Sequence, residues 1–577
     1  MLFIGMLDHS TSRFGLSEIE ALKTAVSREP NDVRNTFLRP HFALVTVDFG
    51  AGSAFRVDDT PAGIGLVCGR PYLHAQAASD MNALTDALRQ RDLIRLSESR
   101  GSFCGLYFDQ AGCILRLCTD KVGVYPIYIA VSGSRVFFSN ALRMLNALPE
   151  VPKQIAPDRL FTSLAFEYCL GKDTVFASID RMYGGEMIEF SRSQAHSEQY
   201  WNWNAVRPQD YSDEALTDAV HQAFSEAVAL RVDTAAPGEL SFLSGGLDSR
   251  CIVAGLRAAG RKVWTLNFAP EGCQDHLFGR LAAQALGAAH FELEVGKDSF
   301  ARSQKRILDA WSTAHPQLAA AGVRPYRVWS GDGGSVGLGH VYLDEEFLRL
   351  LRKDAVRQAC QHFIDANNCR LSLGMLRPQV RAQGIDAPLS SMEREIRRFS
   401  TTDPAKSGFL FLLLNDQRNH LADYFENLDI CKFEFVLPFF DSALLEIVVA
   451  APIEKFLRHA LYSRWLEKFG AAFSSVPWQT YPGHVPCPVP IENYPNLRYQ
   501  WDEDWFDEVE LQQKWAEDMR HSASMLRSRH FSDALLSKKK IWMAYWLTRL
   551  KIRNYKYVLD SARKITQYTS GNRLHLQ

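Results

Sequence analysis

The sequence predicts an α+β first part rich in short strands, followed by an α/β part with a parallel sheet and a helical C-terminal end. Three observations support this. Short apolar or alternating runs ended by Gly, Asp or Asn fill the first two hundred residues, which is typical of strands. Strand-like and helix-like runs alternate between residues 239 and 295, and after about residue 340 most segments have helical periodicity.

In the first part, six runs are expected to form strands, over residues 41–49, 63–69, 103–109, 113–120, 125–131 and 135–140. A helical period then begins at Asp213 and continues to Val232. We therefore expect a boundary near residue 205, after the segment YWNWN, which divides the chain into residues 1–205 and 206–577.

In the second part, the runs ELSFL, KVWTLNF and HFELEV are expected to form strands, and SRCIVAGLRAAG and DHLFGRLAAQALG the helices between them. A strand that returns to the same sheet through a helix lies parallel to its predecessor. The order βαβαβ therefore predicts a parallel sheet covered by helices.

Composition gives no sign of an unusual partner. The 577 residues include 65 basic and 66 acidic ones, so the net charge of -1 provides no global field for nucleic acid or a membrane surface. The eleven cysteines form no CxxC pair, which is typical of reduced thiols in a cytosolic protein. The start has neither a basic region nor a long apolar one, and the longest apolar run, near Phe409, is too short to span a bilayer. We expect a cytoplasmic protein with no membrane span.

One local charge bias exists. Residues 538–577 contain ten Lys or Arg residues and one acid, Asp560. Such a tail is either a solvated or subunit-contacting terminal helix or a docking surface for an anionic partner. A homodimer and an association with a biosynthetic partner through this tail both remain open.

The loop from Ser244 to Ser249, with the sequence SGGLDS, has the features of a phosphate cradle. Its glycines allow close approach of the backbone, its serines add hydroxyl donors, and the following helix begins with unpaired N–H groups. Asp248 would repel a bare phosphate, so a hard cation is expected between them, and Mg²⁺ suits one carboxylate plus phosphate oxygens. The GK[ST] ending of a Walker loop is absent.

The hexapeptide resembles the pyrophosphate-binding loop of the N-type ATP pyrophosphatases, in particular the asparagine synthetase family. That family converts ATP to AMP and pyrophosphate, adenylates a carboxylate and lets an amine displace AMP. The similarity continues through residues 263–295, the loop WSGDGGSVGLGHVY and the segment FEFVLPFFDSALLEIV. The resemblance implies an adenine nucleotide α-hydrolase-like domain with Asp248 and Asp332 as catalytic residues and Mg²⁺ ligands, and with an acidic residue, Asp275, opening the next helix. The residues expected to bind ATP are Leu243, Ser244, Gly245, Gly246, Asp248, Ser249, Leu266, Asn267 and Gly331.

Residues 101–145 and 173–190 are similar to the glutaminase domain of the same family. This resemblance implies an N-terminal nucleophile-hydrolase-like sandwich in the first part. An active glutaminase needs a cysteine after the initiator Met, but Leu2 stands there. The family's Asn-Gly-Glu segment appears as Cys68-Gly69-Arg70, and its ammonium-binding acid as Arg100. We expect this half to be inactive, with Cys68 and Cys104 as core thiols.

The synthetase half departs from the family as well. Ser335 and Val336 replace the Asp-Glu pair that supplies a second Mg²⁺ ligand, which leaves Asp332 as a metal ligand or as the base for the amine. Tyr481 stands at the position of the lysine that stabilises charge on phosphorus. The residues that could supply positive charge instead are His459, Arg464 and His484, while Arg250 faces either a substrate or the surface.

Two functions of different classes follow. The first is an ATP-dependent amide ligase that uses ammonia or an amine on its small-molecule or peptide carboxylate substrate. Lasso-peptide cyclases and β-lactam synthetases resemble this state, since they keep the first domain as a scaffold. The second is a nucleotide-binding scaffold or regulatory protein that has lost its chemistry, as the missing acid and lysine suggest.

Overall fold

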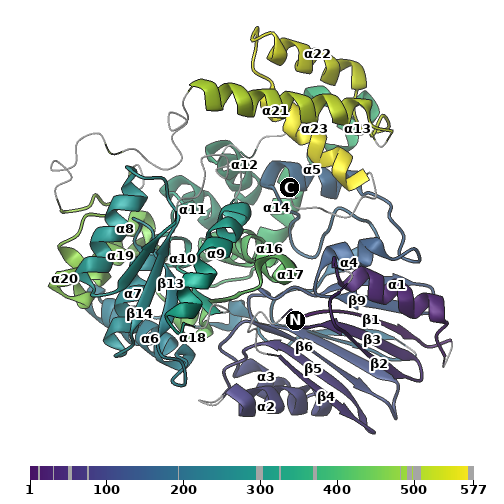
Figure 1. Cartoon of the computed structure of the whole chain (residues 1–577), viewed down its shortest axis with the longest axis horizontal. Coiled ribbons are helices and arrows are strands. Elements are labelled where there is room, and N and C mark those ends of the chain that lie inside the picture. The colour runs from purple at the N-terminus through teal and green to yellow at the C-terminus, as the bar shows by residue number, and fades with distance from the viewer. Residues whose placement is uncertain are drawn as a thin grey trace.

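The computed structural model describes residues 1–10, 13–29, 31–49, 55–73, 77–192, 194–293, 303–323, 327–367, 369, 373–480, 483–489, 497, 508–529 and 531–569. Figure 1 shows the strand-rich first part in purple and blue at the lower right and the α/β part at the left, with a group of late helices above them. Tyr481 lies outside the described residues, so its comparison with the family lysine stays a prediction.

The first part contains two antiparallel six-stranded sheets. One has the order β10-β8-β9-β1-β3-β2, with β1 Leu2–Asp8, β2 Arg34–Arg39, β3 Phe42–Val47, β8 Tyr128–Ser132, β9 Arg135–Ser139 and β10 Ile179–Arg181. The other has the order β12-β11-β7-β6-β5-β4, with β4 Phe55–Thr60, β5 Gly63–Gly69, β6 Phe103–Asp109, β7 Ile114–Thr119, β11 Glu186–Phe190 and β12 Ala195–Gln199. The six predicted strands are confirmed, and the other six were not predicted.

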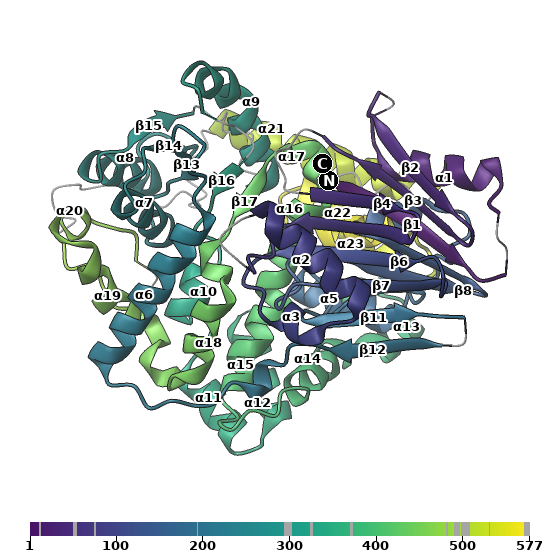
Figure 2. The ribbon, with the colours of Figure 1, turned by 90° about the horizontal axis from the view of Figure 1, so that it is seen from below.

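Side-chain alternation explains how these sheets stack into a sandwich with helices on both outer faces. Along β1, Phe3 points into the core between the sheets, whereas Ile4 joins the outer cluster that packs under α1 (Leu16–Val26) and α4 (Leu142–Ala147). The outer face of the second sheet is covered by α2 (Ala77–Gln90) and α3 (Leu93–Ser97), which Figure 2 shows in front of its strands.

The second part is built on a five-stranded parallel sheet with the order β15-β14-β13-β16-β17. Its strands are β13 Glu239–Phe242, β14 Val263–Asn267, β15 Ala289–Glu292, β16 Arg327–Trp329 and β17 Glu434–Val436. The predicted βαβαβ unit is confirmed, because α7 (Asp248–Ala258) and α8 (Gln274–Ala285) connect its first three strands. After β15 the chain returns to the other side of β13, so the central strand borders a topological switch point, where such sheets bind ligands.

The remaining structure is mostly helical, as expected. Its longer helices are α6 Asp213–Arg231, α9 Ser303–Ala320, α10 Gly334–Gly339, α11 Glu345–Arg352, α12 Val356–Ala366, α13 Pro378–Gly384, α14 Ala387–Arg397, α15 Lys406–Phe411, α16 Arg418–Glu426, α18 Ser442–Ala450, α19 Ala460–Trp465, α21 Glu508–Arg527, α22 Lys538–Arg549 and α23 Lys556–Thr569, and α5 Pro157–Phe166 belongs to the first part. No helix among the described residues is long and apolar enough to cross a membrane.

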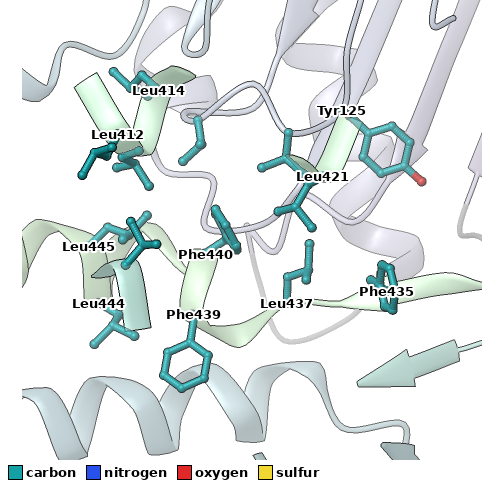
Figure 3. Close-up of a cluster of buried hydrophobic side chains, with 14 of the residues drawn as sticks. Tyr125, Leu412, Leu414, Leu421, Phe435, Leu437, Phe439, Phe440, Leu444 and Leu445 are labelled. Atoms are coloured by element: carbon teal, nitrogen blue, oxygen red, sulfur yellow. The ribbon is translucent and has the colours of Figure 1, made fainter. Parts of the chain in front are cut away.

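The two parts share a hydrophobic core. Figure 3 shows Tyr125 of the first part in one cluster with buried side chains of the second part, among them Leu421 and Phe435. The ring of Tyr125 lies 4.0 Å from that of Phe425, measured between centroids, and its hydroxyl donates to Glu434 at 2.8 Å. Packing of this kind holds the first part against the helices that support the parallel sheet.

Candidate active site

The SGGLDS loop connects the carboxyl end of the central strand β13 to the first turn of α7. The loop holds its own shape, since the N–H of Ser244 donates to Oγ of Ser249 at 3.0 Å and the N–H of Gly246 donates to Oγ of Ser244 at 3.2 Å. Gly245 donates its N–H to Oδ1 of Asp275 at 2.8 Å, and a Cβ there would lie 2.7 Å from the carbonyl oxygen of Gln274. Only glycine allows this approach to the start of α8.

Three of the predicted nucleotide-binding residues lie below the loop. The Asn267 side-chain amide donates to the carbonyl oxygens of Leu243 and Asp275, both at 2.9 Å. Leu243 and Leu266 are almost fully buried in the core. The structure therefore places these three side chains beneath the loop, while Ser244, Gly246 and Asp248 line the cavity above it.

Asp248 is held by three hydrogen bonds. Ser335 donates its N–H to Oδ2 at 2.9 Å and its hydroxyl to Oδ1 at 3.0 Å, and Tyr462 donates its hydroxyl to Oδ1 at 2.7 Å. Burial raises the pKa of Asp248 to about 6, although these bonds from Tyr462 and Ser335 act in the opposite direction. A Cβ at Gly331 would lie 2.5 Å from the backbone nitrogen of Ser249, so the second glycine-rich loop packs directly on the first.

A cavity of about 190 Å³ opens above the loop. The residues that line it are Ser244, Gly246, Leu247, Asp248, Asp275, Ser335, His459, Trp478, Gln479, Thr480 and Val485. None of these described lining residues is Lys or Arg, and two are aspartates. Hard cations prefer carboxylate oxygens, so this set of oxygen donors beside a glycine turn fits Mg²⁺ and phosphate together.

Arg250 lies inside the protein, which corrects the expectation that it faces a substrate or the surface. Its guanidinium donates to the carbonyl oxygens of Val476 and Pro477, both at 2.8 Å, and burial lowers its pKa to about 10. The N–H of Gln479 in turn donates to the carbonyl oxygen of Gly245 at 3.1 Å. Arg250 therefore fixes the segment that forms one wall of the cavity.

The three residues that could replace the positive charge of the family lysine differ in position and in charge. Arg464 pairs with Asp213 near the surface at 2.5 Å and does not line the cavity. His459 does line it, but burial, followed by the charge of His484, lowers its pKa to about 3. The rings of His459 and His484 share a contact of 2.8 Å between their Nδ1 atoms, and Nε2 of His459 lies 3.2 Å from Oγ of Ser335. Both histidines have lowered pKa values, so neither supplies a cation at neutral pH.

Asp332 lies close enough to Asp248 to raise its pKa, but it bonds elsewhere. Oδ2 accepts a bond of 2.6 Å from the Ser330 hydroxyl, and Oδ1 lies 3.6 Å from Nε2 of His420. Burial alone would raise the pKa of Asp332, yet the interaction with His420 lowers it. The same pairing raises the pKa of His420 to about 9, so this histidine is a cation at neutral pH.

Sequence reasoning missed Tyr462, Trp478 and His420. The segment VPWQTYPGHVP, compared with the family's lysine segment, pointed to the region of Trp478, whereas nothing local marks Tyr462 or His420. Both lie far along the chain from the aspartates that they contact, so only the fold brings them together.

The residues compared with a glutaminase pocket serve other purposes. Nε of Arg100 donates to Oδ1 of Asp441 at 3.0 Å, and the buried Asp441 also accepts a bond of 2.7 Å from Arg231. Leu2 is fully buried in the middle of its sheet. Burial, helped by the neighbouring Cys68, raises the pKa of the Cys104 thiol well above its usual value, so it stays protonated.

The chain is similar in sequence to two families of domains. Residues 72–201 match the glutamine amidotransferase domain family, and residues 219–329 match the asparagine synthase family. A glutamine-hydrolyzing asparagine synthetase 3 of Bacillus subtilis is 27% identical over 159 residues, which is 27% of this chain and 25% of that protein. A putative glutamine-hydrolyzing asparagine synthetase 2 of Methanocaldococcus jannaschii is 21% identical over 188 residues, or 32% of this chain and 36% of that protein.

The matches therefore span about a quarter and about a third of the two relatives' lengths. Among solved structures, an allosteric regulatory enzyme of purine biosynthesis is similar with a TM-score of 0.23 and 11% identity, over 63% of this chain and 78% of that chain.

Proposed function

We propose that this chain is an ATP-dependent ligase of the asparagine synthetase type that adenylates a carboxylate and joins the acyl group to an amine. Its similarity to the glutamine amidotransferase and asparagine synthase domain families supports this proposal. The observation that carries the proposal is the position of Asp248. This carboxylate lines a cavity together with Ser244 and Gly246, at the carboxyl end of the central strand of a parallel sheet. That is where such sheets bind nucleotides.

The hydroxyls of Ser244 and Ser249 and the N–H groups at the start of α7 would hold the phosphates, and Asp248 would hold Mg²⁺. Bound Mg²⁺ and ATP supply an electrophilic phosphorus and a pyrophosphate leaving group. Ser335 and Tyr462 keep the Asp248 carboxylate oriented toward the cavity.

The other residues of the site position the reactants. Arg250 holds the wall segment that contains Trp478 and Gln479, so that the cavity keeps its shape. Asp332, whose pKa is lowered by His420, would accept the proton that the attacking amine must lose. The proposal keeps for Asp332 the two roles that the sequence leaves open, a metal ligand or the base for the amine.

We further propose that the amine comes from ammonia or from the substrate itself. Arg100 would repel the ammonium group of glutamine, and its guanidinium is already engaged by Asp441. The neutral Cys104 thiol and the buried Leu2 offer no replacement nucleophile. The first part then acts as a scaffold that packs against the helices of the ligase part.

A nucleotide-binding scaffold is the second candidate, and one observation favours it. Among the described residues, the cavity is lined by no Lys or Arg, and His459 is uncharged there. Charge that develops on phosphorus would have to be stabilised by Mg²⁺ and by backbone N–H groups alone.

Pyrophosphate release separates the two candidates. The purified chain is incubated with ATP and Mg²⁺ against a panel of amino acids, peptides and sugar acids, with and without ammonium, alongside Asp248→Asn. The ligase predicts release that depends on one class of carboxylate and is lost in Asp248→Asn. ATP binding without release for every carboxylate would favour the scaffold. Glutamate release from glutamine would overturn the proposed loss of the glutaminase.

A further inference from the structure

Helix α22 is apolar on two opposite faces. Its inner face places Ile541, Ala544 and Tyr545 in the core that α22 shares with α21 and α23. Its outer face carries Met543, Trp546 and Leu550, with spacings of three and four residues that align them along one side of the helix. A helix that is apolar all round is normally covered on all sides. Figure 1 shows α22 at the upper edge of the molecule, where its outer side faces away from the protein.

We call Met543, Trp546, Leu550, Ile552 and Tyr557 the outer apolar patch. These side chains are between 47% and 67% exposed. Five of the fourteen large apolar side chains that are exposed in the described part of the chain therefore lie within fifteen residues. Scattered exposed apolar residues need no explanation, but Met543, Trp546 and Leu550 line one side of a helix, and an apolar group of this kind marks an interaction surface.

Basic residues border the patch. Lys539 lies at one end of α22, Arg549 on its flank, and Lys551 and Arg553 follow its last turn, all of them exposed. In the described part of the chain, none of these four forms an ion pair, and Arg549 lies over the Trp546 ring at 5.2 Å. The single acid of residues 538–569, Asp560, is paired with Arg563. These four basic side chains therefore give this border of the patch a positive charge.

The positive charge of the basic residues beside the patch indicates which kind of partner can bind there. A second copy of this chain, related by a twofold axis, would bring the same basic residues together and repel. A convex helix face with protruding Trp, Leu and Met side chains and a border of Lys and Arg is the pattern of helices that lie in the interface of anionic membranes. The long basic side chains can reach the headgroups while the apolar ones enter the acyl boundary.

We propose that the outer apolar patch, on α22 and the residues that follow it, binds the surface of an anionic lipid bilayer together with its basic border. Binding of this kind is peripheral, and it adds a location to the protein without involving the cavity at Asp248. The test of membrane binding is independent of the proposed ligase activity, because the patch contains none of the residues of the cavity at Asp248.

Vesicle sedimentation of the full chain tests the proposal. The probes are large vesicles of phosphatidylcholine alone and of phosphatidylcholine mixed with the anionic lipid phosphatidylglycerol. We expect binding to the anionic vesicles only, with a decrease as salt is raised. The double variant Met543→Ser with Leu550→Ser, and the triple variant Lys539→Gln with Arg549→Gln and Lys551→Gln, should each bind about tenfold more weakly.

A matched control is Ile94→Ser, which removes an even more exposed apolar side chain from α3 on another part of the protein and should bind like the parent. Unchanged thermal midpoints show that the variants are folded. Failure of the parent to bind anionic vesicles overturns the proposal. If the parent forms a dimer without lipid and the double variant does not, the patch is a contact with a second copy of the chain. If the parent and the double variant bind anionic vesicles equally, the apolar side chains do not contribute and the proposal is wrong.

Discussion

Ser335 donates both its N–H and its hydroxyl to the carboxylate of Asp248, at 2.9 and 3.0 Å. The resemblance to the asparagine synthetase family implies an acid at position 335 that would share a metal with Asp248. Here a donor faces the carboxylate instead, so the change converts a partner in metal binding into a residue that positions Asp248. Asp248 is then the principal carboxylate of the cavity, and the activity should depend on its placement.

That placement can be disturbed from the neighbouring helix. A Cβ at Gly334 would lie 2.6 Å from Cγ of Asp248, so Gly334→Ala should displace the carboxylate. Displacements of about 1 Å at a reacting centre can reduce turnover about 100-fold. We expect a loss of that order in steady-state pyrophosphate release, with the fold retained. Gly337→Ala is the matched control, because a Cβ at this position of the same helix meets nothing within 4 Å. Equal activity of both variants would contradict the assignment of Asp248.

Arg250→Met should loosen the wall of the cavity. The variant removes both hydrogen bonds to Val476 and Pro477 and leaves two carbonyl oxygens without their donor. We expect a loss of about 2 kcal/mol in the free energy of unfolding and a rise in the KM for ATP that exceeds the change in kcat. Arg257→Met is the control, since this exposed residue of the same helix also donates to two carbonyl oxygens but lies away from the cavity. A KM that stays at the parent value in Arg250→Met would leave Arg250 with a structural role alone.

Asp441→Asn should weaken the junction between the two parts of the chain. Asp441 is fully buried and accepts hydrogen bonds from Arg100 and Arg231. Removal of its charge leaves the buried guanidinium of Arg231 without a counter-charge. Breaking a buried pair in this way costs about 3–5 kcal/mol. Arg100→Gln should cost less, because Arg231 still pairs with Asp441. Urea unfolding measures the loss of stability in both variants. The control is Asp86→Asn, which removes an exposed ion pair with Arg89 and should change the free energy of unfolding by less than about 1 kcal/mol. The reverse order of the two junction variants would refute this account of Arg100.

Stability should depend on pH through Glu426. This buried carboxyl accepts a bond of 2.5 Å from Tyr128 and another from the N–H of Leu142, and burial raises its pKa to about 7. A raised pKa means that the folded state binds the proton more tightly than the unfolded state does. The Glu426 contribution to stability is therefore complete below about pH 4.5 and is lost as the pH rises to about 7, by at most about 3 kcal/mol.

Glu426→Gln has no proton to lose at this position. We expect the difference in unfolding free energy between this variant and the parent to shift in favour of the variant between pH 4.5 and 7 and to stay constant above pH 7. Glu198→Gln, which changes an exposed carboxyl, is the control variant. A difference for Glu426→Gln that is independent of pH would contradict the raised pKa.

The sequence predicted the features that depend on local patterns. The run ELSFL, the glycine turn and the helix after it follow one another within twenty residues, so their order alone indicates a phosphate loop at the end of a strand. Strands such as β4, with its charged sequence FRVDDT, were missed because partly exposed strands lack a run of apolar residues.

Features that depend on long-range contacts were not predictable in this way. Arg250 meets carbonyl oxygens more than two hundred residues away, and Asp332 meets His420 across about ninety residues. The role of Arg100 also follows from a partner in the other half of the chain, Asp441. Arg250, Asp332 and Arg100 are charged, so the sequence predicts that they face solvent or a substrate. In the folded protein, residues distant in the sequence supply a hydrogen-bond or ion-pair partner for each of them.

The most direct test of the central claim is an analysis of nucleotide products by phosphorus NMR, with Mg²⁺, ATP, ammonium and the carboxylate that supports turnover. The account predicts AMP and pyrophosphate in equal amounts, formed only when the carboxylate is present, and no products from Asp248→Asn. Formation of ADP and phosphate, or equal turnover by Asp248→Asn, would contradict it.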